Sequence, residues 1–145
     1  MTKLNRTATK IFLKLVDGLI AGHARKIDNT RGAFMAVSVD YLTADRTRSN
    51  GAGCGSLYAI AHRYEVNGDL VPDPDVEFYV VDDVLEPGQK AVYPTAIDHG
   101  PMGYHRHVDF DEAGQPARFA RRGQADLASF CNAWMRNIAS QQRLG

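Results

Sequence analysis

Apolar residues follow a helical spacing near the two ends of the chain and a strand spacing between them. Residues 4–19 carry an apolar side chain every three or four positions, the spacing of one face of an α-helix. Residues 127–138 repeat this spacing near the C-terminus. In the middle region apolar and polar residues alternate, as they do on β-strands, and no helical stretch separates neighbouring strands. The order predicts an α+β fold, in which an antiparallel sheet of about five to six strands carries an N-terminal and a C-terminal helix on one face.

Turn-forming residues set the boundaries that we expect for these elements. Asn67-Gly68 predicts a tight hairpin, because a type I′ turn needs two residues that tolerate positive φ. Pro72 and Pro74 are expected to end a short strand, since proline cannot donate a hydrogen bond to a neighbouring strand. The first helix is expected to be capped by Thr2 and to end at Gly22. The last helix is expected over 124–142, and the strands over 33–41, 57–66, 69–71, 77–81, 90–97 and 103–111.

Composition fits one soluble domain over residues 1–145. The chain has 145 residues, 44% of them hydrophobic, which excludes a disordered chain, a collagen-like chain and a disulfide scaffold. Its 17 basic and 17 acidic side chains are unevenly spread: residues 1–26 hold six bases and one acid, whereas residues 65–98 hold nine acids and one base. The acids can form a face for a basic partner, or a charged rim that keeps sheet edges from pairing.

The cysteines and the hydropathy pattern indicate a cytoplasmic protein. Two cysteines, Cys54 and Cys131, are too few for a disulfide-stabilised secreted domain, so we interpret both as thiols, with a single bridge between them as the alternative. Lys14 and Asp17 interrupt the apolar run that a secretory signal would need. No segment reaches the roughly 18 apolar residues of a membrane span, so we expect no membrane partner.

The histidine-rich run over residues 98–111 is the best candidate for chemistry. His105, His107 and Asp109 would share one face of a strand, because side chains alternate along it. Histidines two residues apart on a strand lie about 6.5–7 Å apart at Cα, close enough for both imidazoles to reach one metal. Asp109 would complete a site for iron or zinc. The alternative is that this face of the strand is exposed to water and binds no metal. We expect no cofactor, with a divalent transition metal as the alternative. Further ligands would be Asp98, His99 and Asp111.

Cys54 lies in a glycine-rich segment, residues 50–56. Its thiolate can act as a nucleophile if a base such as His62 approaches it. The segment lacks the lysine and the following helix of a phosphate-binding loop. The structural alternative is a flexible connection between two strands.

Three arginines precede the last helix and flank an aromatic residue. Arg118, Arg121 and Arg122 surround Phe119, and arginine beside an aromatic ring can grip phosphate and stack on bases. The zero net charge of the chain argues against strong binding, since affinity for DNA comes largely from neutralised phosphates. A solvated turn is the structural alternative.

The second half of the chain also carries a recognisable spacing of residues. It comprises Asp73-Pro74-Asp75-Val76-Glu77-Phe78, then Tyr93-Pro94, then Asp98 with Gly103-Tyr104, and finally Leu127, Phe130, Trp134, Asn137 and Gln141. These residues resemble a family of small bacterial proteins classed only as a domain of unknown function and associated with plasmids and integrative elements. The resemblance implies an α+β domain in a bacterial cytosol and supplies no catalytic residues.

These observations favour a non-catalytic binding or accessory module of a bacterial mobile element, with a protein as its partner. The alternative is a small metal-dependent enzyme built on His105, His107 and Asp109. A third hypothesis is weak nucleic-acid binding through the first helix and the segment 118–122.

Overall fold

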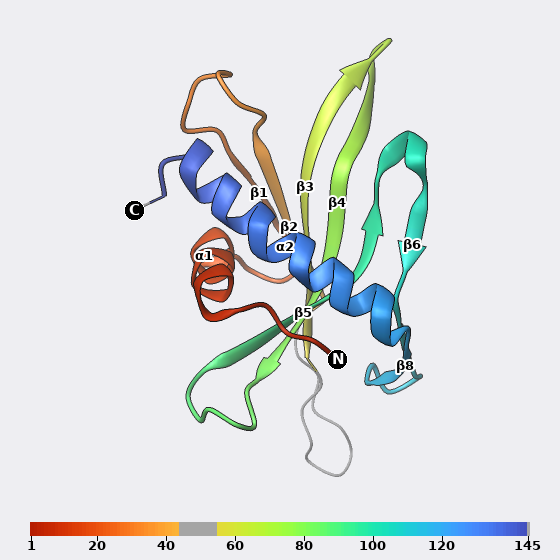
Figure 1. Ribbon diagram of the computed structural model, residues 1–145. Coiled ribbons are helices and arrows are strands. Elements are labelled where there is room, and N and C mark those ends of the chain that lie inside the picture. Colours follow the sequence, from red (N-terminus) through yellow and green to blue (C-terminus); the bar gives the residue numbers. More distant parts are fainter. Residues whose placement is uncertain (44–54, 145) are drawn as a thin grey trace.

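Two helices lie on one face of a six-stranded antiparallel sheet, which confirms the predicted α+β fold (Figure 1). The computed structural model describes residues 1–43 and 55–144. Strands β1 to β6 are neighbours in chain order, and β7 and β8 form a separate small sheet. The elements are α1 (Arg6–Val16), β1 (Ala24–Ile27), β2 (Val37–Thr43), β3 (Ser56–Val66), β4 (Asp69–Asp82), β5 (Lys90–Asp98), the short 3₁₀ helix η1 (Gly100–Met102), β6 (Tyr104–Arg106), β7 (Val108–Phe110), β8 (Pro116–Phe119) and α2 (Arg121–Gln141).

The first helix is shorter than expected, although its apolar stripe is buried. α1 has 11 residues, and the Asn5 side chain caps it by accepting a hydrogen bond from the Ala8 N–H at 2.8 Å. The predicted cap, Thr2, lies before the helix, where its N–H donates to the Gln124 side chain. Ala8 and Phe12 have no exposed surface, so the stripe faces the core as its spacing predicts.

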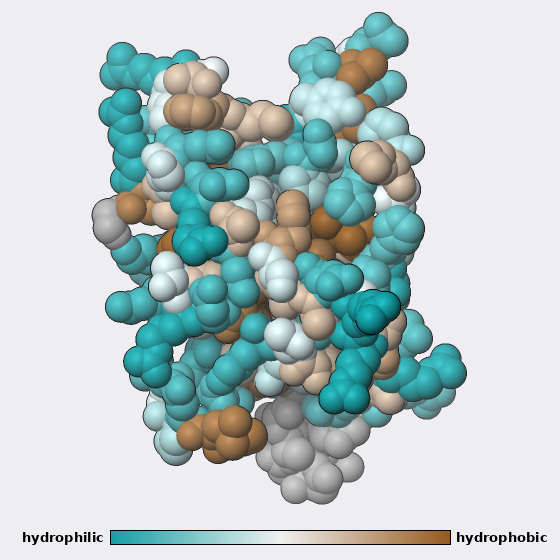
Figure 2. All heavy atoms as spheres, in the orientation of Figure 1, coloured by the Kyte–Doolittle hydropathy of each residue, from teal (hydrophilic) through white to brown (hydrophobic). Residues whose placement is uncertain are grey.

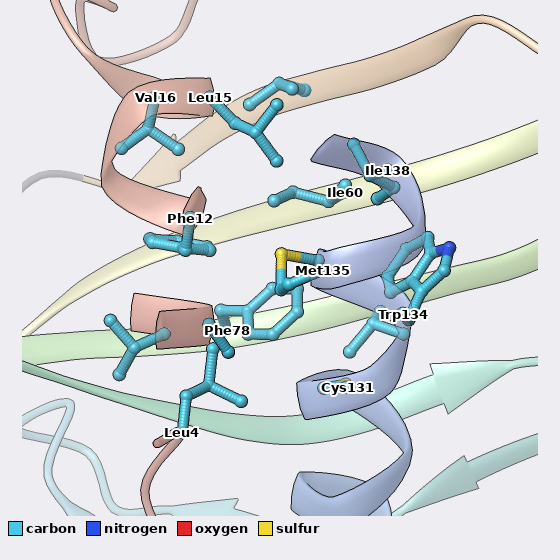
Figure 3. Packing of buried hydrophobic residues seen from close by; sticks show 14 of the residues in the cluster. Leu4, Phe12, Leu15, Val16, Ile60, Phe78, Cys131, Trp134, Met135 and Ile138 are labelled. Atoms are coloured by element: carbon cyan, nitrogen blue, oxygen red, sulfur yellow. The ribbon is translucent and has the colours of Figure 1, made fainter. Parts of the chain in front are cut away.

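The core fills the space between the helices and the face of the sheet that they cover (Figure 3). α2 has 21 residues, and its stripe of Leu127, Cys131, Trp134 and Ile138 is buried there. Phe130 belongs to the same predicted stripe but is 41% exposed and stacks on Trp134. Among the described residues, no helix is long and apolar enough to cross a membrane.

Two glutamines without exposed surface tie the ends of α2 to other parts of the chain. Gln124 accepts a hydrogen bond from the Thr2 N–H at 2.6 Å and donates to the backbone oxygens of Thr2 and Pro94, at 2.8 and 3.1 Å. Gln142 accepts from the Asn29 N–H at 2.7 Å. Because buried amides need partners, Gln124 fixes the N-terminal segment beside β5, and Gln142 fixes the connection between β1 and β2.

Strand β4 runs through both prolines, so the expectation that they end a strand is wrong. β4 has 14 residues, and its pairing with β5 begins only at Asp75. The preceding segment pairs with β3 alone within the described sheet, and it forms the far end of the long β3–β4 hairpin. Pro72 and Pro74 therefore lie on a sheet edge, the position at which strands tolerate proline.

The strand expected over 103–111 is divided between two sheets. β6 pairs with β5, whereas β7 pairs with β8. The division falls at His107, whose N–H donates to the Thr95 carbonyl and whose carbonyl accepts from the Ala120 N–H, both at 2.8 Å. Side-chain alternation indicates an extended backbone but does not specify its pairing partner. The sequence also did not predict β1 and β8, which have four residues each, too few for alternation to be visible.

Candidate functional site

The outer face of the sheet, opposite α1 and α2, carries charged side chains around a floor of alanines. No helix in the described part of the chain covers this face. Strand pairing aligns two adjacent rows of residues across it. The first row, from β2 to β6, is Asp40, Ala59, Glu77, Ala96 and Arg106. The second row is Ser38, Ala61, Asp75, Asp98 and Tyr104.

Glu77 and Arg106 form a bidentate ion pair in the first row. The two terminal nitrogens of Arg106 donate to the two carboxylate oxygens of Glu77, at 3.1 and 3.2 Å. The guanidinium reaches across Ala96, which lies between the two residues in the row and is 1% exposed. Thr95 is fully buried and donates from its hydroxyl to the Glu77 carboxylate at 2.7 Å. The hydrogen bond to Glu77 raises the pKa of Arg106, so the charged guanidinium is a fixed part of this face.

A cluster of three carboxylates, Asp40, Asp75 and Asp98, is less well compensated. Asp75 and Asp98 stand directly opposite each other on β4 and β5, and Arg63 pairs with Asp75 at 3.2 Å. Partial burial raises the pKa of Asp75, Asp40 and Asp98 add to the rise, and Arg63 opposes it. Like charges directly opposite one another destabilise a sheet. This carboxylate cluster would therefore gain from an additional cation.

The β7–β8 hairpin covers a different part of the outer face. Phe110 of β7 packs on Tyr79 of β4, with 5.3 Å between the ring centres, and Tyr79 is 3% exposed. The side chain of Asp75 keeps 29% of its surface exposed. The structure thus leaves the carboxylate cluster accessible while it buries the aromatic end of the same face.

The histidines that the sequence proposed as metal ligands lie in a row at the β6 edge, on the helix side of the sheet. The ring centre of His105 is 6.3 Å from that of His99 and 6.5 Å from that of His107. His107 packs on α2 at Gly123, where an added Cβ would lie 2.6 Å from the ring nitrogen Nδ1. Burial lowers the pKa of His107, and the neighbouring His105 adds to this effect, whereas Asp126 opposes it.

The carboxylates of the proposed metal site lie apart from this histidine row. Asp109 follows the chain into the β7–β8 sheet, where it lies 3.8 Å from Arg118. Asp98 and Asp111 accept backbone hydrogen bonds within their own turns, at 2.8 Å and 2.9 Å. Across residues 1–43 and 55–144, no three His, Cys, Asp or Glu side chains are placed to hold a metal ion together. The site with two histidines and one carboxylate stays a prediction.

The three arginines of the proposed nucleic-acid patch are exposed where α2 begins. Arg118 lies on β8, and Arg121 and Arg122 open the helix. Neither Arg121 nor Arg122 makes an ion pair with another described residue. Nucleic-acid binding at this patch stays a prediction.

The two cysteines differ in what the structure shows of them. Cys54, proposed as a reactive thiol, lies outside the described residues. Cys131 is a free thiol in the core. Burial raises the pKa of Cys131, which opposes formation of a thiolate nucleophile there.

Comparison with known proteins assigns a family to this fold. Residues 7–144 match the family described as a domain of unknown function, DUF6908. The chain belongs to this family. The match covers almost the whole DUF6908 chain, whereas the resemblance seen in the sequence covered about half of it. No curated protein and no solved structure matches this DUF6908 chain.

Sequence reasoning missed the arrangement on the outer face of this DUF6908 domain. Glu77 and Arg106 are 29 residues apart and meet only because β4, β5 and β6 are adjacent. The sequence does place Asp75, Glu77 and Asp98 among the acids of 65–98, but register shifts between paired strands decide which acids face each other. One sequence signal could have indicated this charged face: charged residues occupy alternate positions in strands whose other positions are apolar.

Proposed function

We propose that this domain is a non-catalytic binding module that docks a basic segment of a partner protein on the outer face of its sheet. The observation that carries the proposal is the carboxylate cluster: Arg63 pairs with Asp75, and no described cation forms an ion pair with Asp40 or Asp98. A lysine or arginine from a partner would relieve the repulsion among these carboxylates. The family resemblance in the sequence supports a bacterial cytoplasm and a mobile element as the setting of this function.

Arginine suits this face better than lysine does. The guanidinium is planar and forms bidentate hydrogen bonds with carboxylates. The Arg106–Glu77 pair already shows this geometry on the outer face, with its guanidinium lying over an alanine. Ala59 and Ala61 continue the same floor beside the carboxylate cluster, so a second guanidinium can approach the carboxylates without a large side chain in its path.

A fluorescence anisotropy titration with a dye-labelled, arginine-rich peptide tests the proposal. The wild-type protein should bind the peptide, and binding should weaken when salt rises from about 50 to about 200 mM, because exposed charges are then screened. The double variant Asp75→Asn/Asp98→Asn should lose affinity by at least about tenfold, since a charge-assisted contact is removed from the centre of the site. Circular dichroism of the variant checks that it remains folded.

The matched control removes two negative charges from other exposed positions. Glu112→Gln lies in the β7–β8 turn, and Asp69→Asn lies at the tip of the β3–β4 hairpin. This double variant should bind the peptide within about twofold of the wild type. Equal losses in the two double variants would show general electrostatic attraction and would contradict a site at the carboxylate cluster.

A further inference from the structure

The turn between β4 and β5 presents the two most exposed large apolar side chains in the described part of the chain. Val84 is 92% exposed and Leu85 is 81% exposed. In Figure 2 a hydrophobic patch lies over this turn, at the lower edge of the molecule. Single exposed apolar residues are common on protein surfaces, but adjacent ones on a projecting turn form a contiguous apolar surface that favours contact with a partner.

Ion pairs and hydrogen bonds brace this turn. Asp83, at its start, pairs with Lys3 at 2.5 Å, and Asp82 pairs with Lys90 at 2.7 Å. The Leu85 N–H donates to the Asp83 carboxylate at 2.9 Å. The hydrogen bond from Lys3 lowers the pKa of Asp83, so this carboxylate stays ionised. The apolar tip is therefore presented by a prearranged backbone, which reduces the conformational entropy lost when a partner binds.

A hollow of about 510 Å³ lies between this turn and α1. Lys10 of α1 lines the hollow and makes no ion pair with any described residue. The hollow therefore offers positive charge beside the apolar tip. Four basic side chains line the hollow, and three of them form ion pairs: Lys3 with Asp83, Arg6 with Glu86, and Lys90 with Asp82. Among the described residues that line it, Lys10 therefore supplies the unpaired positive charge.

We propose that Val84 and Leu85 form a docking knob for a protein partner, separate from the carboxylate cluster of the outer face. The partner offers an apolar pocket that receives the two aliphatic side chains and a carboxylate that reaches Lys10. The apolar tip, its braced backbone and the uncompensated charge of Lys10 together define this chemistry.

Other occupants fit these observations less well. The apolar stripe of α1 is buried in the core, so only two aliphatic side chains could enter a bilayer, too few for stable anchoring. A symmetric contact between two knobs would offer no free carboxylate to Lys10, because the acids beside each knob, Asp82, Asp83 and Glu86, are already in ion pairs.

Affinity capture from the native host tests the proposal when it is followed by measurements on purified proteins. The wild-type chain, Val84→Ser/Leu85→Ser, Lys10→Glu and Leu70→Ser are each immobilised, and retained proteins are quantified by mass spectrometry. Leu70 is 70% exposed on the β3–β4 hairpin, so its substitution is the matched loss of an exposed aliphatic side chain. Each protein lost in both the knob variant and Lys10→Glu is then produced in pure form for calorimetric titration.

The expected result is one partner whose affinity falls at least about tenfold in the knob variant and in Lys10→Glu but is unchanged in Leu70→Ser. Reversal of the partner's carboxylate to lysine should restore binding to Lys10→Glu. The proposal is overturned if no retained protein depends on both Val84/Leu85 and Lys10. It is also overturned if sedimentation shows a knob-dependent dimer, or if the wild type binds phosphatidylserine vesicles through the knob.

Discussion

Replacing Gln124 by leucine removes a buried clamp without a large change in side-chain volume. Gln124 makes three hydrogen bonds, one of them to the buried Pro94 carbonyl and two to the partly buried Thr2 backbone. An unpaired buried carbonyl costs about 1–3 kcal/mol, and each lost bond to a group that water can reach costs about 0.5–1 kcal/mol. We therefore expect Gln124→Leu to lower the free energy of unfolding by about 2–5 kcal/mol.

Urea denaturation followed by the fluorescence of the single tryptophan, Trp134, measures this loss. Gln141→Leu is the control, because Gln141 is a half-buried residue at the other end of α2 and should change stability by less than about 0.5 kcal/mol. Amide exchange adds a local readout: the Leu4 N–H, which donates to the Val92 carbonyl, should lose protection when the N-terminal segment is released. A stability for Gln124→Leu equal to that of the wild type would refute the clamp.

Two further predictions concern the aromatic contact between α2 and β3. Trp134→Ala should cost about 3–5 kcal/mol in thermal unfolding, because the ring is 5% exposed, whereas Phe130→Ala should cost clearly less. Burial lowers the pKa of His62 below 6.5, so under more acidic conditions the unfolded chain takes up a proton that the folded chain resists, and stability falls as pH falls. Urea titrations between about pH 7 and pH 5 should show that the free energy of unfolding depends less on pH in His62→Phe than in the wild type. An equal pH dependence in the two proteins would contradict a lowered pKa of His62.

The helices and most strands could be predicted because their local patterns agree with their tertiary environment. α2 buries the stripe that its spacing predicts, and the Asn67-Gly68 turn joins β3 to β4. The start of the first helix was misplaced because two residues can serve as its cap. The backbone N–H and carbonyl of Thr2 bond to the Gln124 side chain, and Asn5 caps the helix instead. A contact across more than a hundred residues decided a local boundary, and no local pattern reports such a contact.

Strand pairing could not be predicted because alternation is the same in every sheet. The run 103–111 is extended on both sides of His107, yet its two halves pair with different strands. The proposed set of His105, His107 and Asp109 assumed one continuous strand, and the division places Asp109 beside Arg118. Conversely, His99 approaches His105 because η1 turns the chain back on itself, which spacing along one strand cannot show.

The acidic residues of the segment 65–98 fall into two groups in the fold. The acids of the β4–β5 turn meet bases of the N-terminal region, as in the pair of Lys3 with Asp83, and there they stabilise a turn. Asp75 and Asp98 instead face each other on the outer face, where Arg63 is the one cation of residues 1–43 and 55–144 that forms an ion pair with either of them. Acids that only kept sheet edges from pairing would not need to stand opposite each other within the sheet.

The carboxylate of Asp75 should therefore reduce stability while it serves binding. Its pKa is raised in the folded chain, so the folded state favours the protonated form and loses stability as pH rises through that pKa. Asp75→Asn mimics the protonated form and should raise the melting temperature at neutral pH, even though it leaves Arg63 without its carboxylate. The same variant should bind the arginine-rich peptide more weakly. A lower melting temperature would mean that the Arg63 pair outweighs the repulsion, and the carboxylate cluster would then be a structural feature rather than a binding site.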